Sequence, residues 1–273
     1  MPFDDYRLAN RANWDARVDI HSPSAEYGVD RFTTDPSYLS DVVRFDKEKL
    51  GAVRGKRLIH LQCHIGTDTI SWARLGAEVT GVDFSENSIA AAQDLSRVAG
   101  TPARFVVSEL YDSPSMVPEK FDIVYTGIGA ICWLPNIEGW ARVVASFLEP
   151  GGVFYMREGH PMMWAIDWED TERLSVTLPY FETAEPIAEV EEETYAGEGV
   201  VASPLNYGWN HGMGETLTAL LHAGFRLDAI EEYDFCDWGQ LLAQMVQGDD
   251  GYWRLPDRPE RLPLMWSVLA TRL

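Results

Sequence analysis

The chain has 273 residues, a length that suits a single α/β domain. Its 43 acidic and 22 basic residues give a net charge of −21, and a surface of that sign repels phosphate backbones. No basic patch with interleaved aromatic residues occurs, so the composition argues against nucleic acid as a partner.

The sequence has no run of about 18 apolar residues, the length that a membrane-spanning helix needs. Its beginning, Met1 to Asp5, lacks the basic and apolar regions of a signal peptide. The three cysteines, Cys63, Cys132 and Cys236, form no C-x-x-C pair, so we expect reduced thiols. These features predict a cytoplasmic protein without a membrane partner, and they leave its oligomeric state open.

Alternating strands and helices are predicted between residues 57 and 158 from hydrophobic periodicity and turn residues. Ser85 is a typical N-cap, and Gly100 is a typical helix stop. Pro150-Gly151-Gly152 ends a helix that has an apolar stripe. The predicted strands are 57–62, 78–83, 105–110, 121–126 and 153–157, and the predicted helices are 67–75, 85–100 and 136–148.

The most informative segment is the first of these strands with the turn that follows it. A buried strand turns sharply into a helix, and the next strand ends on Asp83. In a parallel sheet, ligands bind at the carboxyl ends of the strands, where helix N-termini and loop amides face a crevice. Asp83 is well placed there to accept hydrogen bonds from both hydroxyls of a ribose. The pattern predicts a nucleoside-binding site.

A dinucleotide site requires three glycines in the pattern G-x-G-x-x-G, so that the backbone can approach a pyrophosphate. In this chain Gln62 and His64 stand where the first two glycines would fall, and only Gly66 is present. The missing glycines count against a nicotinamide-dependent oxidoreductase. That activity remains an alternative, and a titration would test whether the protein binds the nicotinamide cofactor.

The same segment resembles the first motif of the class I S-adenosylmethionine-dependent methyltransferases, hydrophobic-hydrophobic-Asp-hydrophobic-Gly-Cys-Gly-x-Gly. Three further motifs, 105–110, 121–126 and 148–154, resemble that family and occur in the right order. The resemblance therefore covers residues 55–158. The sequences of residues 60–64 and of Cys132-Trp133-Leu134-Pro135 resemble those of bacterial small-molecule methyltransferases, some of which work in natural-product tailoring. Leu58, Ile59, Leu61, Cys63 and Gly66 match the first motif, whereas His60, Gln62 and His64 depart from it.

The resemblance implies a doubly wound, Rossmann-like sheet of seven strands in an α/β fold. The last strand, 264–271, would lie antiparallel between strand five and strand six, 225–235. The implied cofactor is S-adenosyl-L-methionine, with S-adenosyl-L-homocysteine as its product. The cofactor-binding residues that we expect are Gln62, Cys63, His64, Gly66, Asp83, Phe84, Ser85, Glu109, Leu110, Thr126 and Gly127.

The remaining chain is interpreted as additions to one methyltransferase domain, 1–273. Residues 1–50 are expected to form a lid over the cofactor, and residues 55–158 form the cofactor-binding core. The irregular stretch 159–210 is rich in aromatic side chains, and we expect it to be a substrate-binding insertion, although packing onto the sheet would explain the same residues. Residues 211–273 complete the core.

Methyl transfer to oxygen needs a base, whereas a neutral amine often needs none. His160, His211 and Tyr207 are the candidate bases. We expect no metal, because His60, Cys63 and His64 are close in sequence but have no second ligand cluster. The acidic balance gives a slight preference for nitrogen over oxygen in a small organic acceptor, although a solvated acidic loop is the simpler interpretation of residues 182–193.

The departures in the first motif also leave a non-catalytic alternative open. A domain that keeps this fold for a binding role would have its cofactor crevice filled by side chains. The shape of the crevice therefore distinguishes the two interpretations.

Overall fold

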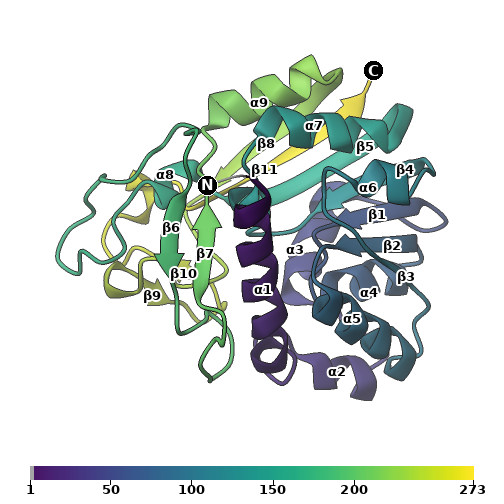
Figure 1. The fold of residues 1–273 in the computed structure, drawn as a ribbon, viewed down its shortest axis with the longest axis horizontal. Helices are drawn as coiled ribbons and strands as arrows, with labels where there is room; N and C mark the ends of the chain where they lie inside the picture. Colours follow the sequence, from purple (N-terminus) through teal and green to yellow (C-terminus); the bar gives the residue numbers. More distant parts are fainter. Residues whose placement is uncertain (1–2) are drawn as a thin grey trace.

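A computed structural model describes residues 3–273, so Met1 and Pro2 of the expected lid lie outside the described residues. Its centre is a sheet of seven strands in the order β3-β2-β1-β4-β5-β11-β8 (Figure 1). The first five are parallel, and β11 is antiparallel to both β5 and β8, which confirms the predicted fold. The strands are β1 Arg57–Leu61, β2 Glu78–Asp83, β3 Arg104–Val107, β4 Phe121–Thr126, β5 Leu148–Gly159, β8 Phe225–Tyr233 and β11 Met265–Arg272.

Helices cover both faces of the sheet (Figure 1). One apolar core lies under α7 and α9, and two others lie under the helices of the opposite face. Side chains cap two of these helices, since Ser85 accepts a hydrogen bond from Ser88 N, as predicted, and Asn136 accepts one from Gly139 N. The helices are α3 Asp41–Leu50, α4 Thr67–Arg74, α5 Glu86–Val98, α6 Ser113–Met116, α7 Ile137–Ser146 and α9 Met213–His222.

The order of the strands reverses between β1 and β4. The chain runs outward from β1 to β3, returns to β4 beside β1, and then runs to β5. At such a point, the loops after the two neighbouring strands run in opposite directions. A crevice forms between these loops at the carboxyl edge of the sheet. The fold therefore places a ligand site above the ends of β1, β2 and β4.

The beginning of β5 was predicted wrongly. Leu148 already pairs with Phe121 of β4, and the register then shifts so that Val153 pairs with Ile123. The Pro150-Gly151-Gly152 turn lies inside the strand as a bulge, with Gly151 at a φ of 89°. Helix α7 correspondingly ends at Ser146 and not at Leu148.

The strand β11 completes the core from the end of the chain. It pairs along its whole length with β5 and β8, and Trp266, Val268 and Ala270 are fully buried. The neighbouring β8 ends at Tyr233, two residues before the predicted end. Burial on both faces explains why this last strand is so apolar.

The segment 159–210 is more ordered than predicted. It contains α8, Pro161–Trp164, and a hairpin of β6, Ile187–Val190, with β7, Leu205–Gly208. A second addition, residues 234–264, contains β9 Val246–Gln247 and β10 Trp253–Arg254 and was not predicted. The two additions share an apolar core in which Met163 and Ile166 meet Cys236, Leu255 and Leu264.

The N-terminal segment forms α1, Phe3–His21, and α2, Val29–Thr34. Helix α1 runs across the front of the molecule, between the β6–β7 hairpin and α5, and contacts both (Figure 1). We call residues 3–28 and 187–209 together the roof, because they lie over the carboxyl edge of the parallel strands.

Candidate functional site

The turn after β1 has an unusual backbone. Gln62, His64 and Gly66 all have positive φ angles, of 58°, 46° and 80°. This left-handed conformation favours glycine and costs other residues about 1–2 kcal/mol each. The loop therefore keeps a glycine-like path at the two positions where the family motif has glycine and this chain does not.

Side-chain hydrogen bonds hold the two non-glycine residues in that conformation. Gln62 Nε2 donates to Ala130 O, at 2.8 Å, in the loop after β4. The ring of His64 bonds Ser88 Oγ at 2.9 Å and His21 Nδ1 of α1 at 2.9 Å. His64 thus connects the turn to both α5 and the roof, a role that its position in the sequence did not indicate.

Asp83 ends β2 beside this turn. One carboxylate oxygen accepts a hydrogen bond from His64 N at 2.8 Å, and the other accepts one from Ser85 N at 2.9 Å. Burial raises the pKa of Asp83 to about 6, against the opposing effect of these amides. The carboxylate is thus fixed in direction, and it keeps lone pairs for a ligand with hydroxyl donors.

A cavity extends from Asp83 along the carboxyl edge, with an empty volume of about 1070 Å³ that includes its opening to solvent. The crevice is therefore not filled by side chains, so the structure lacks the feature that the non-catalytic alternative predicted. Its walls include Tyr6, Asn10, Trp14, Tyr27, His60, Asp68, Gly129, Ala130, Trp133, Tyr195 and Trp209.

Most of the expected cofactor-binding residues line this cavity: Gln62, Cys63, His64, Asp83, Phe84, Glu109, Leu110 and Gly127. Gly66, Ser85 and Thr126 do not. A Cβ on Gly66 would lie 2.8 Å from Ala92 Cβ, so this glycine allows α5 to approach the turn. Ser85 caps α5, and Thr126 is fully buried at the end of β4.

Glu109 lies beyond Asp83, after β3. Its Oε2 accepts hydrogen bonds from Tyr111 N at 2.7 Å and Asp112 N at 3.3 Å, and Arg7 of α1 lies 3.9 Å from the same oxygen. Burial raises its pKa. Glu109 lines the cavity at the end next to β3.

The three candidate bases lie outside the cavity. His160 caps α8, accepting a hydrogen bond from Met162 N at 3.0 Å, and its other nitrogen lies 3.0 Å from Glu232 Oε1. His211 Nε2 donates to Leu134 O at 2.8 Å, and its Nδ1 lies 2.9 Å from Glu182 Oε2. These contacts hold both imidazole rings outside the cavity.

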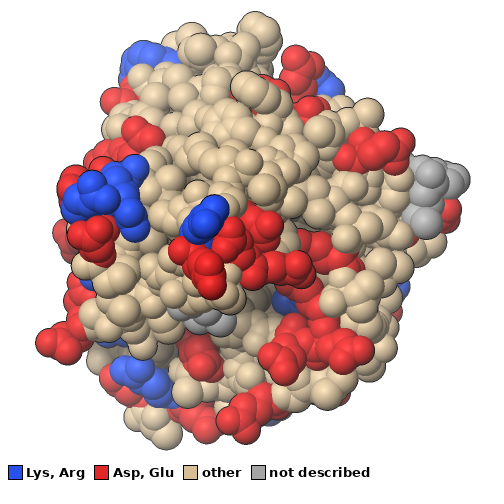
Figure 2. All heavy atoms as spheres, turned by 90° about the vertical axis from the view of Figure 1, so that its left-hand side faces the viewer, with Lys and Arg blue, Asp and Glu red and all other residues tan. Residues whose placement is uncertain are grey.

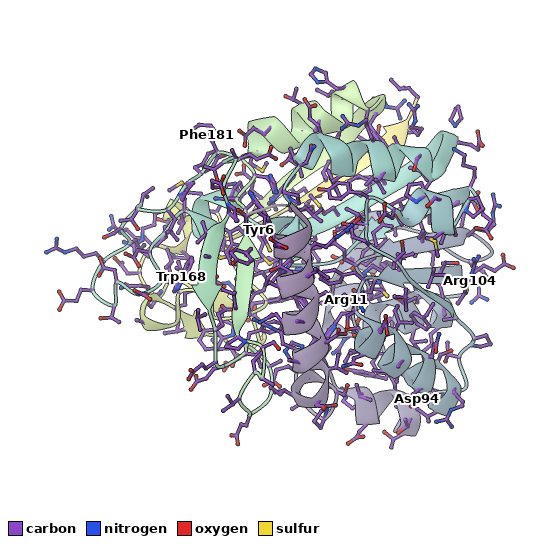
Figure 3. The ribbon with its side chains drawn as sticks, in the orientation of Figure 1. Tyr6, Arg11, Asp94, Arg104, Trp168 and Phe181 are labelled. Carbon is purple, nitrogen blue, oxygen red and sulfur yellow. The ribbon has the colours of Figure 1, made fainter. Side chains whose placement is uncertain are left out.

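Tyr207, the third candidate, belongs to the roof. The side-chain amide of Asn10 in α1 makes two hydrogen bonds to the backbone of Tyr207. Its Nδ2 donates to Tyr207 O at 2.8 Å, and its Oδ1 accepts from Tyr207 N at 2.7 Å. Its ring packs on Tyr6, with ring centroids 4.8 Å apart. Figure 3 shows Tyr6 and Arg11 projecting from α1, and Arg11 reaches Glu86 of α5 at 2.9 Å. These contacts fasten α1 to both of its neighbours.

Two carboxylates at the site were not predicted from the sequence. Glu158 at the end of β5 is buried and accepts four backbone hydrogen bonds, three of them from Gly129, Ala130 and Ile131, so it holds the loop after β4 in place. Asp68 in the first turn of α4 lines the cavity. Acidic residues are common in a first helical turn, because they interact with the helix dipole, so its position in the sequence gave no specific signal.

Among residues 3–273, no three side chains of His, Cys, Asp and Glu are grouped so that they could hold a metal ion. In the same part of the chain no helix has the length and apolar character required to cross a membrane. The absence of a metal in the reaction stays a prediction.

Comparisons with known proteins agree with this geometry. Residues 59–154 match the methyltransferase domain family. A ubiquinone biosynthesis O-methyltransferase of Proteus mirabilis (strain HI4320) is 24% identical over 156 residues, or 52% of this chain and 63% of that protein. The match thus spans less than two thirds of the relative's own length.

Solved structures of methyltransferases share the fold. An S-adenosylmethionine-dependent methyltransferase from Mesorhizobium loti aligns with a TM-score of 0.54 and 22% identity, over 84% of this chain and 96% of that one. A glycopeptide N-methyltransferase in complex with S-adenosylmethionine aligns with a TM-score of 0.52 and 18% identity, over 85% of this chain and 92% of that one.

The cavity fits S-adenosylmethionine on its own evidence. Asp83 offers a fixed carboxylate for ribose hydroxyls, and Gln62 Oε1 is a buried acceptor without a partner among the described residues. Gly127 leaves open a space that a Cβ would occupy, 3.3 Å from His60 Nε2. The strand order, the turn after β1 and the match of residues 59–154 to the methyltransferase domain family show that this chain has the class I methyltransferase fold.

Proposed function

We propose that this protein transfers a methyl group from S-adenosylmethionine to a nitrogen or oxygen atom of a small organic molecule. The observation that carries this proposal is the single cavity, which runs from Asp83 to an aromatic wall above the loop after β4. One end suits a nucleoside and the other suits an organic acceptor, so donor and acceptor would meet in one enclosed space.

For the cofactor, we assign the ribose to Asp83 and the adenine to the neighbourhood of Glu109 and Leu110. Bound cofactor supplies an electrophilic methyl group on its sulfonium. The chain supplies alignment and the exclusion of water, which are the main contributions that a protein makes to such an in-line displacement.

The acceptor end is bounded by Gly127–Ala130 on the sheet side and by aromatic side chains of the roof. Tyr27 and Tyr195 meet there, with their hydroxyl oxygens 2.5 Å apart, and Trp133 is anchored by its Nε1 to Gly129 O at 2.8 Å. Rigid aromatic walls supply contact area for a small acceptor at low entropic cost.

Nitrogen is preferred over oxygen as the methylated atom. His160 and His211 are engaged elsewhere, and burial lowers the pKa of the cavity-lining His60 to about 3, so this histidine is a weak base. A neutral amine often needs only orientation, whereas a hydroxyl needs proton removal. Acidic side chains also gather in the middle and lower parts of the face that Figure 2 shows, which favours amine-bearing molecules near the protein.

Three measurements test this function. Calorimetry should detect S-adenosylhomocysteine binding and no comparable binding of NAD, and mass spectrometry after incubation of labelled cofactor with panels of small amines and small alcohols should detect the methyl group on amines first. Addition of a chelator should leave turnover unchanged. Absence of S-adenosylhomocysteine binding would contradict the proposed activity, and transfer to alcohols alone would contradict the preference for nitrogen.

A further inference from the structure

We propose that Asp68 and Gln62 form the site for the α-ammonium group of the cofactor's amino-acid tail. The inference rests on the proposed function, since it concerns how the same cavity holds S-adenosylmethionine. It assigns a binding role to a carboxylate outside the first family motif.

Asp68 is a partly buried carboxylate whose neighbourhood lacks a free counter-charge. It faces the cavity from the first turn of α4, and burial raises its pKa to about 6, opposed by a hydrogen bond from the Ser40 hydroxyl. Among the described residues it makes no ion pair within 4.0 Å. A carboxylate in this environment is stabilised by a cation that arrives with a ligand.

The guanidinium of Arg157, which lowers the pKa of Asp68 by its charge, is already paired with other carboxylates. Arg157 is fully buried, donates from Nε to Asp46 Oδ1 at 2.6 Å, and pairs through its other nitrogens with Asp237. Its charge is therefore matched by two other carboxylates. The cavity side of Asp68 remains available.

Gln62 provides the second group. Its Nε2 donates to Ala130 O, which fixes the orientation of the amide, and its Oε1 is buried without a hydrogen-bond partner in the described part of the chain. A buried acceptor without a partner is rare in proteins and destabilises the fold. An ammonium group has three donors, enough for both this oxygen and the Asp68 carboxylate.

Gly127 keeps room for such a group beside the Asp68 carboxylate. A Cβ at this position would lie 3.5 Å from Asp68 Oδ2 and 3.3 Å from His60 Nε2. A methyl group there would occupy the space directly in front of the carboxylate. His60 itself bonds Thr69 through Nδ1 at 2.8 Å, so its other nitrogen faces this space.

The order of the strands explains why the ammonium belongs to the cofactor and not to the acceptor. Asp83 ends β2, Glu109 follows β3 on one side, and Gln62 follows β1 on the other. With ribose at Asp83 and adenine toward Glu109, the rest of the cofactor extends over β1 toward β4. Asp68, Gln62 and Gly127 lie on that path, whereas the acceptor walls lie farther along, after β4.

The sequence supports the same assignment. The first family motif has an aspartate where this chain has His60, and a neutral histidine cannot supply the missing negative charge. Asp68 stands eight positions later, in the first turn of α4, and restores one carboxylate to the same part of the cavity.

The test compares two ligands that differ only in the tail beyond sulfur. S-adenosylhomocysteine carries the amino-acid tail, and 5′-methylthioadenosine lacks it. We expect Asp68→Asn to weaken S-adenosylhomocysteine binding about 10- to 100-fold, the range for a charged hydrogen bond, and to change methylthioadenosine binding less than about 3-fold. Asp83→Asn should weaken both ligands, and Asp94→Asn, an exposed α5 position labelled in Figure 3, should weaken neither.

Calorimetry on the full chain gives each dissociation constant, and circular dichroism shows whether the variants are folded. If Asp68→Asn does not fold, Asp68→Glu serves as a second variant that keeps the charge but moves it about 1 Å, and it should lose affinity for S-adenosylhomocysteine alone. Equal losses for both ligands, or no loss for either, would overturn the ammonium site and leave the proposed function intact. Wild-type protein that binds neither ligand would overturn the proposed function itself.

Discussion

The sheet and the roof are held together by different forces. In the sheet, β11 and its neighbours bury aliphatic and aromatic side chains on both faces. The roof depends instead on polar contacts between distant segments, such as Asn10 with Tyr207 and Arg17 with Glu191 and Thr194. A small aromatic cluster of Tyr6, Tyr207 and Trp209 is its apolar part.

Because of this difference, we expect the sheet to determine the stability of the domain and the roof to determine the access of ligands to the cavity. Burial of a large side chain contributes about 1.5–3 kcal/mol, so the sheet accounts for most of the stability of the domain. Polar contacts between loops contribute about 1 kcal/mol each and exchange readily with water. We therefore expect the roof to open locally more easily than the sheet, which holds the residues at the strand ends in place.

The largest effect is expected from removal of β11. A chain that ends at Pro263 lacks the strand between β5 and β8, and it exposes the cores that Trp266 and Val268 complete. We expect no folded protein, measured by circular dichroism and gel filtration. Removal of Leu273 alone, which is 65% exposed, is the control and should leave folding unchanged. A folded truncated domain would refute the division into sheet and roof.

Asp83→Ala should have the next largest effect, at the edge of the sheet. The variant loses the carboxylate proposed for the ribose, so we expect a loss of about 1–3 kcal/mol in the binding of S-adenosylhomocysteine, measured by calorimetry. His64 N and Ser85 N also lose their acceptor. Asp83→Asn keeps one acceptor oxygen and should lose less. Unchanged affinity in the alanine variant would remove the ribose assignment.

The sheet, unlike the roof, could be predicted from the sequence for a physical reason. A parallel strand is buried on both faces, so its residues form a short apolar run. Polar residues then mark the boundaries: Asp83 ends a strand, and Ser85 begins a helix. The hairpin β6–β7 is partly exposed and short, and its pairing depends on contacts with α1 that are 170 or more residues away in sequence.

The site shows the same division. The cavity-lining residues Asp83 and Gln62 lie next to strand ends, where the pattern places them. The sequence could not show which histidine lies at the cavity, because a histidine near a strand or helix end can have a structural role. His160 caps a helix, and His211 holds a loop through a hydrogen bond. Only the three-dimensional contacts of these side chains distinguish such roles from proton transfer.

Asn10→Ala should loosen the roof and leave the sheet unaffected. The substitution removes two hydrogen bonds from the buried backbone of Tyr207, and we expect the local opening of residues 205–208 to become easier by about 1–2 kcal/mol. Hydrogen exchange there should accelerate about 5- to 30-fold, while amides of β1 and β4 keep their protection. Asn87→Ala, which removes an exposed hydrogen bond to Asp15 O, is the matched control. Equal acceleration in β1 would mean that roof and sheet open together.

The smallest effect concerns the stability cost of a binding group on the sheet side. Burial raises the pKa of Asp68 from 3.8 to about 6, so the folded chain binds a proton more tightly than the unfolded chain. Stability from this group therefore falls as the pH rises from about 4 to 6 and then stays constant. Asp68→Asn removes this titration, so the ligand-free variant should be more stable than wild type by about 1–2 kcal/mol at pH 7.5 and about equal to it near pH 4. Urea denaturation at both pH values measures the difference. A variant that is less stable than wild type at pH 7.5 would show that Asp68 supports the fold, whereas the expected gain would identify a carboxylate kept for its ligand at the expense of stability.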